Sequence, residues 1–236
     1  MTPTPVLVTR PEPGASATAR QLRSMGFAPE VAPLLTIAPM PAALPPPEAL
    51  HGIVVASQHA VPPLPRSHRG LPLFAVGEAT AAVARQSGFA DVRSADGDAP
   101  ALAALVALSL MPGDRPLLLV AGLGQGRHLM RLLTESGFAV ERREVYAAQP
   151  VDALPETARA MICGCRRGQV LLFSRETALC LSRLIQETEL LAGLSTLDLA
   201  AISRPVAEAV RGLPWRSIRV AMKPTENAVL ALLHDR

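Results

Sequence analysis

Aromatic side chains are scarce in this sequence: Phe, Trp and Tyr together make up 3% of its 236 residues. Proteins that bind single-stranded nucleic acid stack the bases on aromatic side chains set in a basic surface. The net charge of +3 comes from arginines spread along the chain, without the dense Lys/Arg runs of nucleic-acid arms or polybasic membrane segments. We therefore expect neither nucleic acid nor a membrane as a partner.

Long apolar runs are also missing. The longest apolar segment, residues 99–111, is interrupted by Ser109 and followed by Pro112 and Gly113. It is shorter than the roughly 18 uncharged apolar residues that a transmembrane helix needs, so we interpret it as a core helix. The first residues, MTPTPVLVTRPEP, do not combine a cationic region with a long apolar core, as a secretory signal does. We therefore expect a soluble, cytoplasmic protein.

Cysteine is rare, and its pattern does not suit a metal site. The three cysteines, Cys163, Cys165 and Cys180, are odd in number and lack the second pair that zinc sites and disulfide frameworks require. The five histidines have no ligand-like spacing, and we interpret His59 and His128 as solvated polar residues in preference to anion contacts. The sequence thus predicts reduced thiols and no bound metal.

What the sequence does contain is apolar material in alternating strands and helices. Hydrophobic residues make up 49% of the chain, enough for a substantial core. Residues 6–9 form an apolar run typical of a strand, and the apolar residues of 15–25 recur at three- and four-residue steps on one helical face. Gly26 then stops the helix, residues 27–37 return to extended character, and a stiff proline-rich connector follows at 39–47.

The same order of strand, glycine-bearing loop, helix, glycine and strand returns over residues 117–148. Aligning residues 25–37 with 136–148 places a Gly-Phe-Ala triplet in register in both copies. Two further pairs of segments, in each of which an apolar run leads into a helical stretch, match in the same way: 53–57 with 170–174, and 74–81 with 199–207. The chain therefore contains an internal repeat.

Alternating strands and helices of this length predict an α/β fold. Each crossover helix returns the chain to a parallel neighbouring strand, so the repeat predicts two similar doubly wound parallel-sheet domains. Ligands of open α/β sheets bind beyond the carboxyl ends of the strands, in the loops whose helix N-termini favour a carboxylate-rich or phosphate-rich ligand. The candidate loops follow Thr9, Ala56, Val76, Val120, Phe173 and Ile202.

Nucleotide-binding and hydrolase motifs are matched poorly. Gly122-x-Gly124-x-Gly126 follows a strand and opens a helix, but its third glycine is one position early for a dinucleotide fingerprint, and no acidic residue ends a following strand. No Walker, HExxH or G-x-S-x-G pattern occurs. Ser57 and Ser174 follow strands without a recognisable His and Asp, so we interpret them as helix caps.

Tyr146 is the only tyrosine of the chain. We expect it to end a strand over residues 140–146, just before the chain returns toward its first half. A lone tyrosine in that place has two interpretations, an amphipathic ring packed in an interface or a proton donor. The residues alone leave both open.

Six segments together resemble the uroporphyrinogen-III synthase family: VLVTRPEPGASATARQL, IVVASQHAV, FAVGEATAAVARQSGF, GRHLMRLLTESGFAVERREVYAAQP, VLLFSRETAL and VAMKPTENAVLALL. They cover nearly the whole chain, and their order, together with Pro224-Thr225, makes the combined match specific. The resemblance implies two domains joined by two connecting segments. The first is discontinuous, residues 1–36 with 152–236, and the second is the inserted stretch 37–151.

The resemblance also implies an activity in porphyrin and heme biosynthesis. Members of the family are lyases that cyclise linear hydroxymethylbilane to uroporphyrinogen III, with loss of water, inversion of the last pyrrole ring and no metal or organic cofactor. The substrate is expected in a cleft between the domains of a monomer. By similarity, the residues that bind it are Thr9, Arg10, Ser57, Thr80, Ser174 and Thr225, and Tyr146 stands near the departing hydroxyl as the catalytic residue.

Two segments depart from the family pattern. Ala56-Ser57 stands where members usually carry Thr-Ser, and residues 203–207 lack the Gly and Thr of a Gly-x-x-Thr-Ala segment, with Arg204 placing a charge there. Two alternatives to the enzyme therefore stay open. One is a non-catalytic bilobal binding protein for a small polyanion, and the other is an inactive or regulatory homologue of the synthase.

Overall fold

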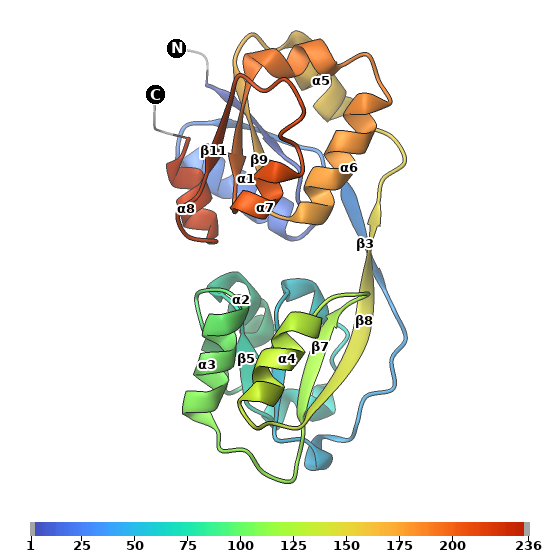
Figure 1. Ribbon diagram of the computed structural model, residues 1–236, viewed down its shortest axis with the longest axis vertical. Coiled ribbons are helices and arrows are strands. Elements are labelled where there is room, and N and C mark those ends of the chain that lie inside the picture. Colours follow the sequence, from blue (N-terminus) through green and yellow to red (C-terminus); the bar gives the residue numbers. More distant parts are fainter. Residues whose placement is uncertain (1–2, 234–236) are drawn as a thin grey trace. The chain divides into compact units, whose positions relative to one another are not determined.

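The computed structural model describes residues 3–233. The chain forms two compact units, Met1–Thr36 with Gln149–Arg236 and Ile37–Ala148. It passes from the first unit to the second within β3 (Leu35–Pro39) and returns within β8 (Val140–Pro150) (Figure 1). The first unit is therefore built from two separate stretches of sequence.

A five-stranded parallel sheet forms the centre of the first unit, with the strands in the order β11-β10-β9-β1-β2. The strands are β1 (Pro5–Val8), β2 (Ala28–Val31), β9 (Gly168–Leu172), β10 (Leu197–Ala201) and β11 (Ser217–Val220). The helices are α1 (Gly14–Ser24), α5 (Glu156–Gly164), α6 (Arg175–Gln186), the 3-10 helix η4 (Leu191–Thr196), α7 (Arg204–Glu208) and α8 (Glu226–Ala231).

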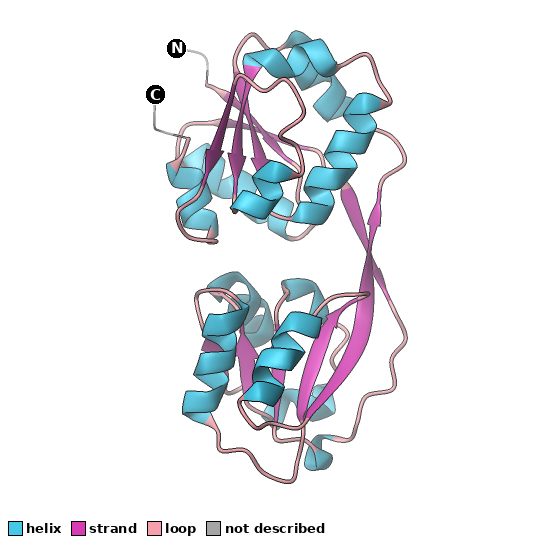
Figure 2. Ribbon diagram, in the orientation of Figure 1, coloured by secondary structure: helices cyan, strands magenta, loops and turns pink. Residues whose placement is uncertain are grey.

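Helices cover this sheet on both faces (Figure 2). On one face α1 and α8 contribute Leu22 and Leu230 to a cluster with Val6, Val8 and Leu171 of the strands. On the other face α5 packs against β1, and α6 against β9. Strands β9 and β10 are consequently buried along their whole length, and each is apolar except for one polar residue near its amino end, Gln169 in β9 and Asp198 in β10.

The second unit holds a six-stranded sheet in the order β3-β8-β7-β4-β5-β6, in which the strands from β8 to β6 are parallel. Its remaining strands are β4 (Gly52–Val55), β5 (Leu73–Ala75), β6 (Val92–Ser94) and β7 (Leu117–Gly122). The α-helices are α2 (Glu78–Gln86), α3 (Ala99–Ser109) and α4 (Arg127–Glu135), and the 3-10 helices are η1 (Pro47–Ala49), η2 (Gln58–Ala60) and η3 (Arg66–Gly70).

This second sheet is also covered on both faces. Ala60 of η2 and Ala81 of α2 pack with Ile53 on one face. Leu102 of α3 and Leu129 of α4 belong to the cluster on the other face. The α/β fold class with doubly wound parallel sheets, predicted from the sequence, is therefore confirmed.

The predicted core helix over residues 99–111 is a surface helix instead. Helix α3 ends at Ser109, and it buries Leu102, Ala103 and Val106 against the sheet. Leu108 is 88% exposed, because only one side of a helix that covers a sheet can face the core. Among residues 3–233, no helix combines the length and the apolar character needed to cross a membrane.

The two units share one spatial order of strands. The repeated segments pair β4 with β9, β5 with β10, β7 with β1 and β8 with β2. These pairs turn the order β6-β5-β4-β7-β8 of one sheet into the order β11-β10-β9-β1-β2 of the other. Along the chain, however, the first unit begins with β1 and β2 and resumes with β9. The strands of the first unit are thus a circular permutation of those of the second. The order of the repeated segments along the sequence does not reveal this permutation.

The repeated Gly-Phe pair ends a helix in both units. Gly26 after α1 and Gly137 after α4 have φ values of +85° and +91°, a left-handed conformation that glycine adopts without a steric cost. The N–H of the following Phe27 donates to Leu22 O, and the N–H of Phe138 donates to Leu133 O. The glycine N–H groups donate as well, Gly26 to Arg23 O and Gly137 to Thr134 O. Both helices therefore end in the same turn with two hydrogen bonds, and the sequence repeat has a local structural cause.

A polar cluster spans the strands of the first sheet at their amino ends. The carboxylate of Asp198 on β10 is nearly buried and accepts hydrogen bonds from Arg216 Nε at 2.8 Å and from Ser217 Oγ at 2.6 Å. Arg219 forms a longer ion pair with it at 3.9 Å. Burial raises the pKa of Asp198, but the hydrogen bonds from Arg216 and Ser217 outweigh it, and the net effect is a lowered pKa.

We expect Asp198→Asn to lower the free energy of unfolding at neutral pH by about 2–3 kcal/mol, because it leaves Arg216 without its buried counter-charge. Since the pKa of Asp198 is lowered on folding, its contribution is present above the pKa of an unfolded aspartate and is lost as pH falls through the folded pKa. Urea denaturation at neutral and acidic pH measures both effects. The difference between the two proteins should shrink in acid, and the exposed control Asp114→Asn should match the wild type at both pH values.

Candidate active site

Each sheet has one point at which successive crossovers diverge to opposite sides. In the first unit this switch point lies between β1 and β9, and in the second it lies between β4 and β7. The loops that follow the two strands of such a pair separate and leave room for a ligand beyond the carboxyl ends. Most of the polar residues singled out in the sequence lie at these two places.

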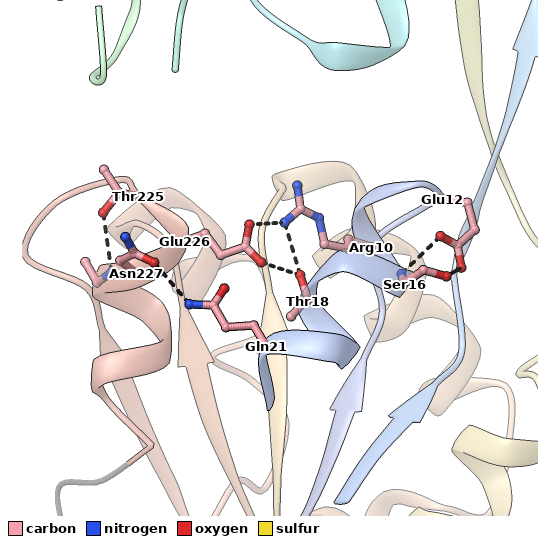
Figure 3. Close-up of polar contacts among 9 residues, drawn as sticks. Arg10, Glu12, Ser16, Thr18, Gln21, Thr225, Glu226 and Asn227 are labelled. Atoms are coloured by element: carbon pink, nitrogen blue, oxygen red, sulfur yellow. Dashed lines mark hydrogen bonds and ion pairs between the residues drawn. The ribbon is translucent and has the colours of Figure 1, made fainter. Parts of the chain in front are cut away.

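In the first unit, Arg10 follows β1 and is held by a carboxylate. Its Nη1 donates to Glu226 Oε2 at 3.0 Å and to Thr18 Oγ1 at 3.3 Å, and Thr18 Oγ1 donates in turn to Glu226 Oε1 (Figure 3). The Arg10 side chain is 17% exposed and that of Glu226 25%. Figure 3 shows the second terminal nitrogen of Arg10 directed away from this pair. Glu226 and Thr18 therefore occupy one edge of the guanidinium, and its second terminal nitrogen can donate to another acceptor.

Hydroxyl groups cap the neighbouring helices of this unit. Ser174 Oγ accepts from Thr177 N–H at the start of α6, and Thr225 Oγ1 accepts from Ala228 N–H at the start of α8. Thr9 is fully buried and donates to Leu171 O at 2.8 Å, which fixes the end of β1 against β9. The guanidinium carbon of Arg10 lies 4.6 Å from the centroid of the Phe173 ring, so Arg10 is oriented from two sides.

In the second unit, Tyr146 of β8 lies across the end of β7. The residue is 3% exposed, and its Oη donates to Gln125 Oε1 at 3.1 Å. The ring rests on Gly122, where a Cβ atom would come within 2.7 Å of Tyr146 Cζ. His59 of η2 meets the ring edge-on, with 5.6 Å between the centroids. The tyrosine is therefore packed through its ring and bound through its hydroxyl.

The glycine loop after β7 is held by residues of β8. Glu144 Oε1 accepts from Gly124 N–H at 2.9 Å, and Arg142 Nη1 donates to Gln125 O at 2.7 Å. The hydrogen bond from Gly124 and that from Arg142 lower the pKa of Glu144 below its ordinary value. Leu123 N–H donates to Tyr146 O. The N–H groups of Leu123 and Gly124 are thus bound by β8, and the N–H of Gln125 donates to Gly122 O.

This geometry explains the glycines that resemble half of a dinucleotide fingerprint. Gly124 and Gly126 have φ values of +74° and +84°, so they serve the loop conformation, and Gly122 makes room for the Tyr146 ring. A phosphate cradle needs backbone N–H groups that point at the ligand. Those of Leu123 and Gly124 point elsewhere, so the loop is a support for Tyr146 and Gln125.

A sequence-family comparison decides the family of the chain. The family model for uroporphyrinogen-III synthase HemD matches residues 16–231. The chain belongs to the uroporphyrinogen-III synthase family. The resemblance drawn from the six sequence segments is thereby confirmed, and with it the assignment to an enzyme of the lyase class.

A solved synthase structure shares the fold. The uroporphyrinogen-III synthetase of Helicobacter pylori superposes with a TM-score of 0.63 at 17% identity, over 98% of each chain. The synthase of Thermus thermophilus gives a TM-score of 0.42 at 16% identity, over 97% of this chain and 94% of that one. At 17% identity, the Helicobacter structure shows a common fold and nothing beyond the fold. No curated protein sequence matches the chain.

The residues expected to serve the synthase reaction fall into two groups. Arg10, Ser174 and Thr225 lie in the first unit, where Phe173 and Glu226 connect them. Ser57, Thr80 and Tyr146 lie in the second unit. Ser57 Oγ accepts from His59 N–H at 3.3 Å, and His59 touches Tyr146, so these residues form one cluster. Thr80 is buried in the first turn of α2, which packs on η2.

Two expectations about this synthase need correction. Tyr146 does not end its strand, because β8 continues to Pro150 and pairs with β3 beyond the point where β7 stops. His59 is not a solvated side chain, since it is partly buried and its ring packs against Tyr146. His128 is exposed, as expected, and its Nδ1 lies 3.2 Å from Arg131 Nη2.

Sequence reasoning missed the partners that orient Arg10 and Tyr146. Glu226 directly follows the cap Thr225, and an acidic residue in the first turn of a helix is usually explained by the helix dipole alone. Gln125 is the one polar side chain among residues 122–126, which is a usable signal. Among residues 3–233, no three or more His, Cys, Asp or Glu side chains are grouped in a way that could hold a metal ion.

We expect Gly122→Ala to displace the Tyr146 ring, since the new methyl group would lie 2.9 Å from Oη as well as 2.7 Å from Cζ. Overpacking of this kind lowers the free energy of unfolding by about 1–3 kcal/mol. Urea denaturation measures the loss, and near-ultraviolet spectra report the environment of the single tyrosine. Gly113→Ala, where nothing lies within 4 Å of the added atom, is the matched control. Equal stability of the two variants would contradict the packing described.

Proposed function

We propose that this chain converts hydroxymethylbilane into uroporphyrinogen III, with loss of water and inversion of the last pyrrole ring, and that it needs no metal or organic cofactor. The observation that carries the proposal is the family match over residues 16–231. A phenol and a guanidinium placed at the switch points of the two sheets supply suitable chemistry for a substrate with a leaving hydroxyl and several carboxylates.

Arg10 is proposed to bind a substrate carboxylate. Glu226 already occupies one edge of its guanidinium, so a substrate carboxylate would either use the remaining edge or exchange with Glu226. Ser57, Thr80, Ser174 and Thr225 are proposed to share carboxylate binding with the N–H groups of the helix starts that they belong to. Substrate binding of this kind spreads the energy over several contacts, and positioning of a flexible chain is then the main catalytic effect.

Tyr146 is proposed to assist departure of the substrate hydroxyl. When the C–O bond breaks, its electron pair stays on oxygen and the remaining carbon becomes the cationic azafulvene that is attacked in cyclisation. A phenolic proton delivered to the oxygen lets it leave as water. The proton that the attacked pyrrole carbon releases on cyclisation then restores the phenol, so the enzyme is regenerated without a cofactor.

The compact units 1–36 with 149–236 and 37–148 are proposed to act as the two domains of the enzyme. We further propose that it acts as a cytoplasmic monomer whose partner is the linear tetrapyrrole, without nucleic acid or membrane partners. The absence of dense basic runs and of a membrane-spanning helix in residues 3–233 supports the last point.

The direct test is an assay in which hydroxymethylbilane is supplied and the isomers of the product are resolved. A synthase accelerates formation of the type III isomer over the spontaneous type I isomer. Binding of the bilane without this acceleration would instead support a binding protein. Neither binding nor acceleration would indicate an inactive homologue, for which the departure at residues 203–207 is the first place to look.

Tyr146→Phe separates ring packing from proton donation, because the ring is retained. We expect normal folding, near-normal KM and a kcat at least about tenfold lower, the lower end of general-acid effects. Circular dichroism and the isomer-resolved assay measure these quantities. A folded Phe variant with wild-type kcat would reduce Tyr146 to a packing residue.

Arg10→Ala is expected to lower kcat/KM by roughly ten- to a hundredfold, since a charge-assisted hydrogen bond contributes about 1.5–3 kcal/mol. Glu226→Gln should keep the wild-type kcat and lower KM by at most about fivefold, because the partly exposed pair that a substrate carboxylate displaces is worth about 1 kcal/mol or less. Steady-state kinetics check both. Arg20→Ala, an exposed arginine of α1, is the control and should behave as the wild type. An unchanged KM in Arg10→Ala would exclude Arg10 from the substrate site.

A further inference from the structure

The side chain of Gln125 is placed to control the hydroxyl of Tyr146. Its Oε1 accepts the Tyr146 hydrogen bond at 3.1 Å, and an amide oxygen can only accept, so the phenolic proton points at Gln125. A proton held in that direction cannot at the same time be given to a substrate oxygen. The free protein therefore holds its proton donor in a resting orientation.

The backbone of Gln125 is anchored, so that side-chain rotation is the motion left to it. Its carbonyl accepts from Arg142 Nη1 at 2.7 Å, and its N–H donates to Gly122 O at 2.9 Å. The preceding Gly124 is bound by Glu144. Arg142 and Glu144 from β8 lie beside the pair, and His59 from η2 lies at the ring edge.

A side-chain amide has a donor as well as an acceptor at the same distance from the chain. Turning the amide of Gln125 over replaces Oε1 by Nε2–H without moving the loop. Tyr146 Oη then accepts a hydrogen bond, and its own proton is free to point elsewhere. A hydrogen bond donated to Oη also stabilises the negative charge that develops as the proton leaves.

We propose that Gln125 is the positioning residue of Tyr146: its amide oxygen accepts the hydrogen bond from the phenol in the free protein, and the amide, turned over, donates to Tyr146 Oη while the phenolic proton passes to the leaving hydroxyl. The inference rests on the proposed function of Tyr146. In the step itself the Tyr146 O–H bond and the substrate C–O bond break, water forms, and the phenolate accepts from Gln125 Nε2–H until the proton from cyclisation returns.

The contact can be tested without substrate, because Tyr146 is the only tyrosine and its phenolate absorbance titrates alone. In Gln125→Glu the carboxylate accepts from the phenol but cannot donate, and its charge opposes the phenolate. We expect the pKa of Tyr146 to rise by about one unit or more relative to the wild type. Gln86→Glu, the same change at the exposed last residue of α2, should leave the titration unchanged.

The role in turnover is tested with Gln125→Met, which keeps an unbranched side chain of similar length but lacks the amide. We expect kcat to fall about tenfold with KM within about twofold of the wild type. If Gln125 acts through Tyr146, the double variant Gln125→Met with Tyr146→Phe should be no slower than Tyr146→Phe alone. A merely structural residue would slow both backgrounds by the same factor.

The outcomes separate the two claims. An unshifted pKa in Gln125→Glu, or equal slowing by Gln125→Met in both backgrounds, would overturn the role of Gln125 while Tyr146→Phe remains impaired. Wild-type kcat in Tyr146→Phe together with a shifted pKa would overturn the catalytic role of Tyr146, and the positioning role with it. A shifted pKa, a slow Gln125→Met and a double variant as fast as Tyr146→Phe support the proposal.

Discussion

Both sheets are buried on both faces, and this burial dictates where polar side chains can stand. A parallel strand covered by helices on its two sides is largely apolar, as β7 is along its whole length and β9 is after Gln169. Polar groups are then restricted to the strand ends, the loops beyond them and the first turns of the helices that follow. Arg10, Ser57 and Thr225 occupy such places. The position of the candidate site follows from the same constraint that forms the core.

The two polar clusters share one design, although their chemistry differs. Arg10 is bound by Glu226, which resembles a substrate carboxylate, and Tyr146 is bound by Gln125, which resembles a hydroxyl acceptor. An internal partner keeps a charged or reactive group oriented before substrate binds, and so reduces the ordering that binding would otherwise require. In the proposed roles of Arg10 and Tyr146, a substrate group would also compete with this partner. In each pair, the partner that orients the functional group is also the one that would have to give way to the substrate.

The hydroxyl groups at the helix starts have a structural role that does not depend on substrate. Ser57, Ser174 and Thr225 each accept from a backbone N–H of the first turn. A capping oxygen of this kind stabilises a helix by about 1 kcal/mol. The cap role was predicted for Ser57 and Ser174 from their position after a strand, and it is confirmed for both. We propose carboxylate binding as a second role for them, because a hydroxyl oxygen that accepts from the backbone can still donate its own proton.

The sequence by itself determined the local features of this protein, because each depends on residues that are close along the chain. Helix ends such as Gly26-Phe27, the caps and the apolar strands are of this kind, and the ordered set of motifs was sufficient to identify the family. Only the tertiary structure decided which distant groups meet. Arg10 and Glu226 are 216 residues apart and Tyr146 and Gln125 are 21 apart, and their contacts depend on strand order, on the permuted repeat and on the space above Gly122. Such contacts arise when whole elements pack against one another, so no spacing of residues along the chain encodes them.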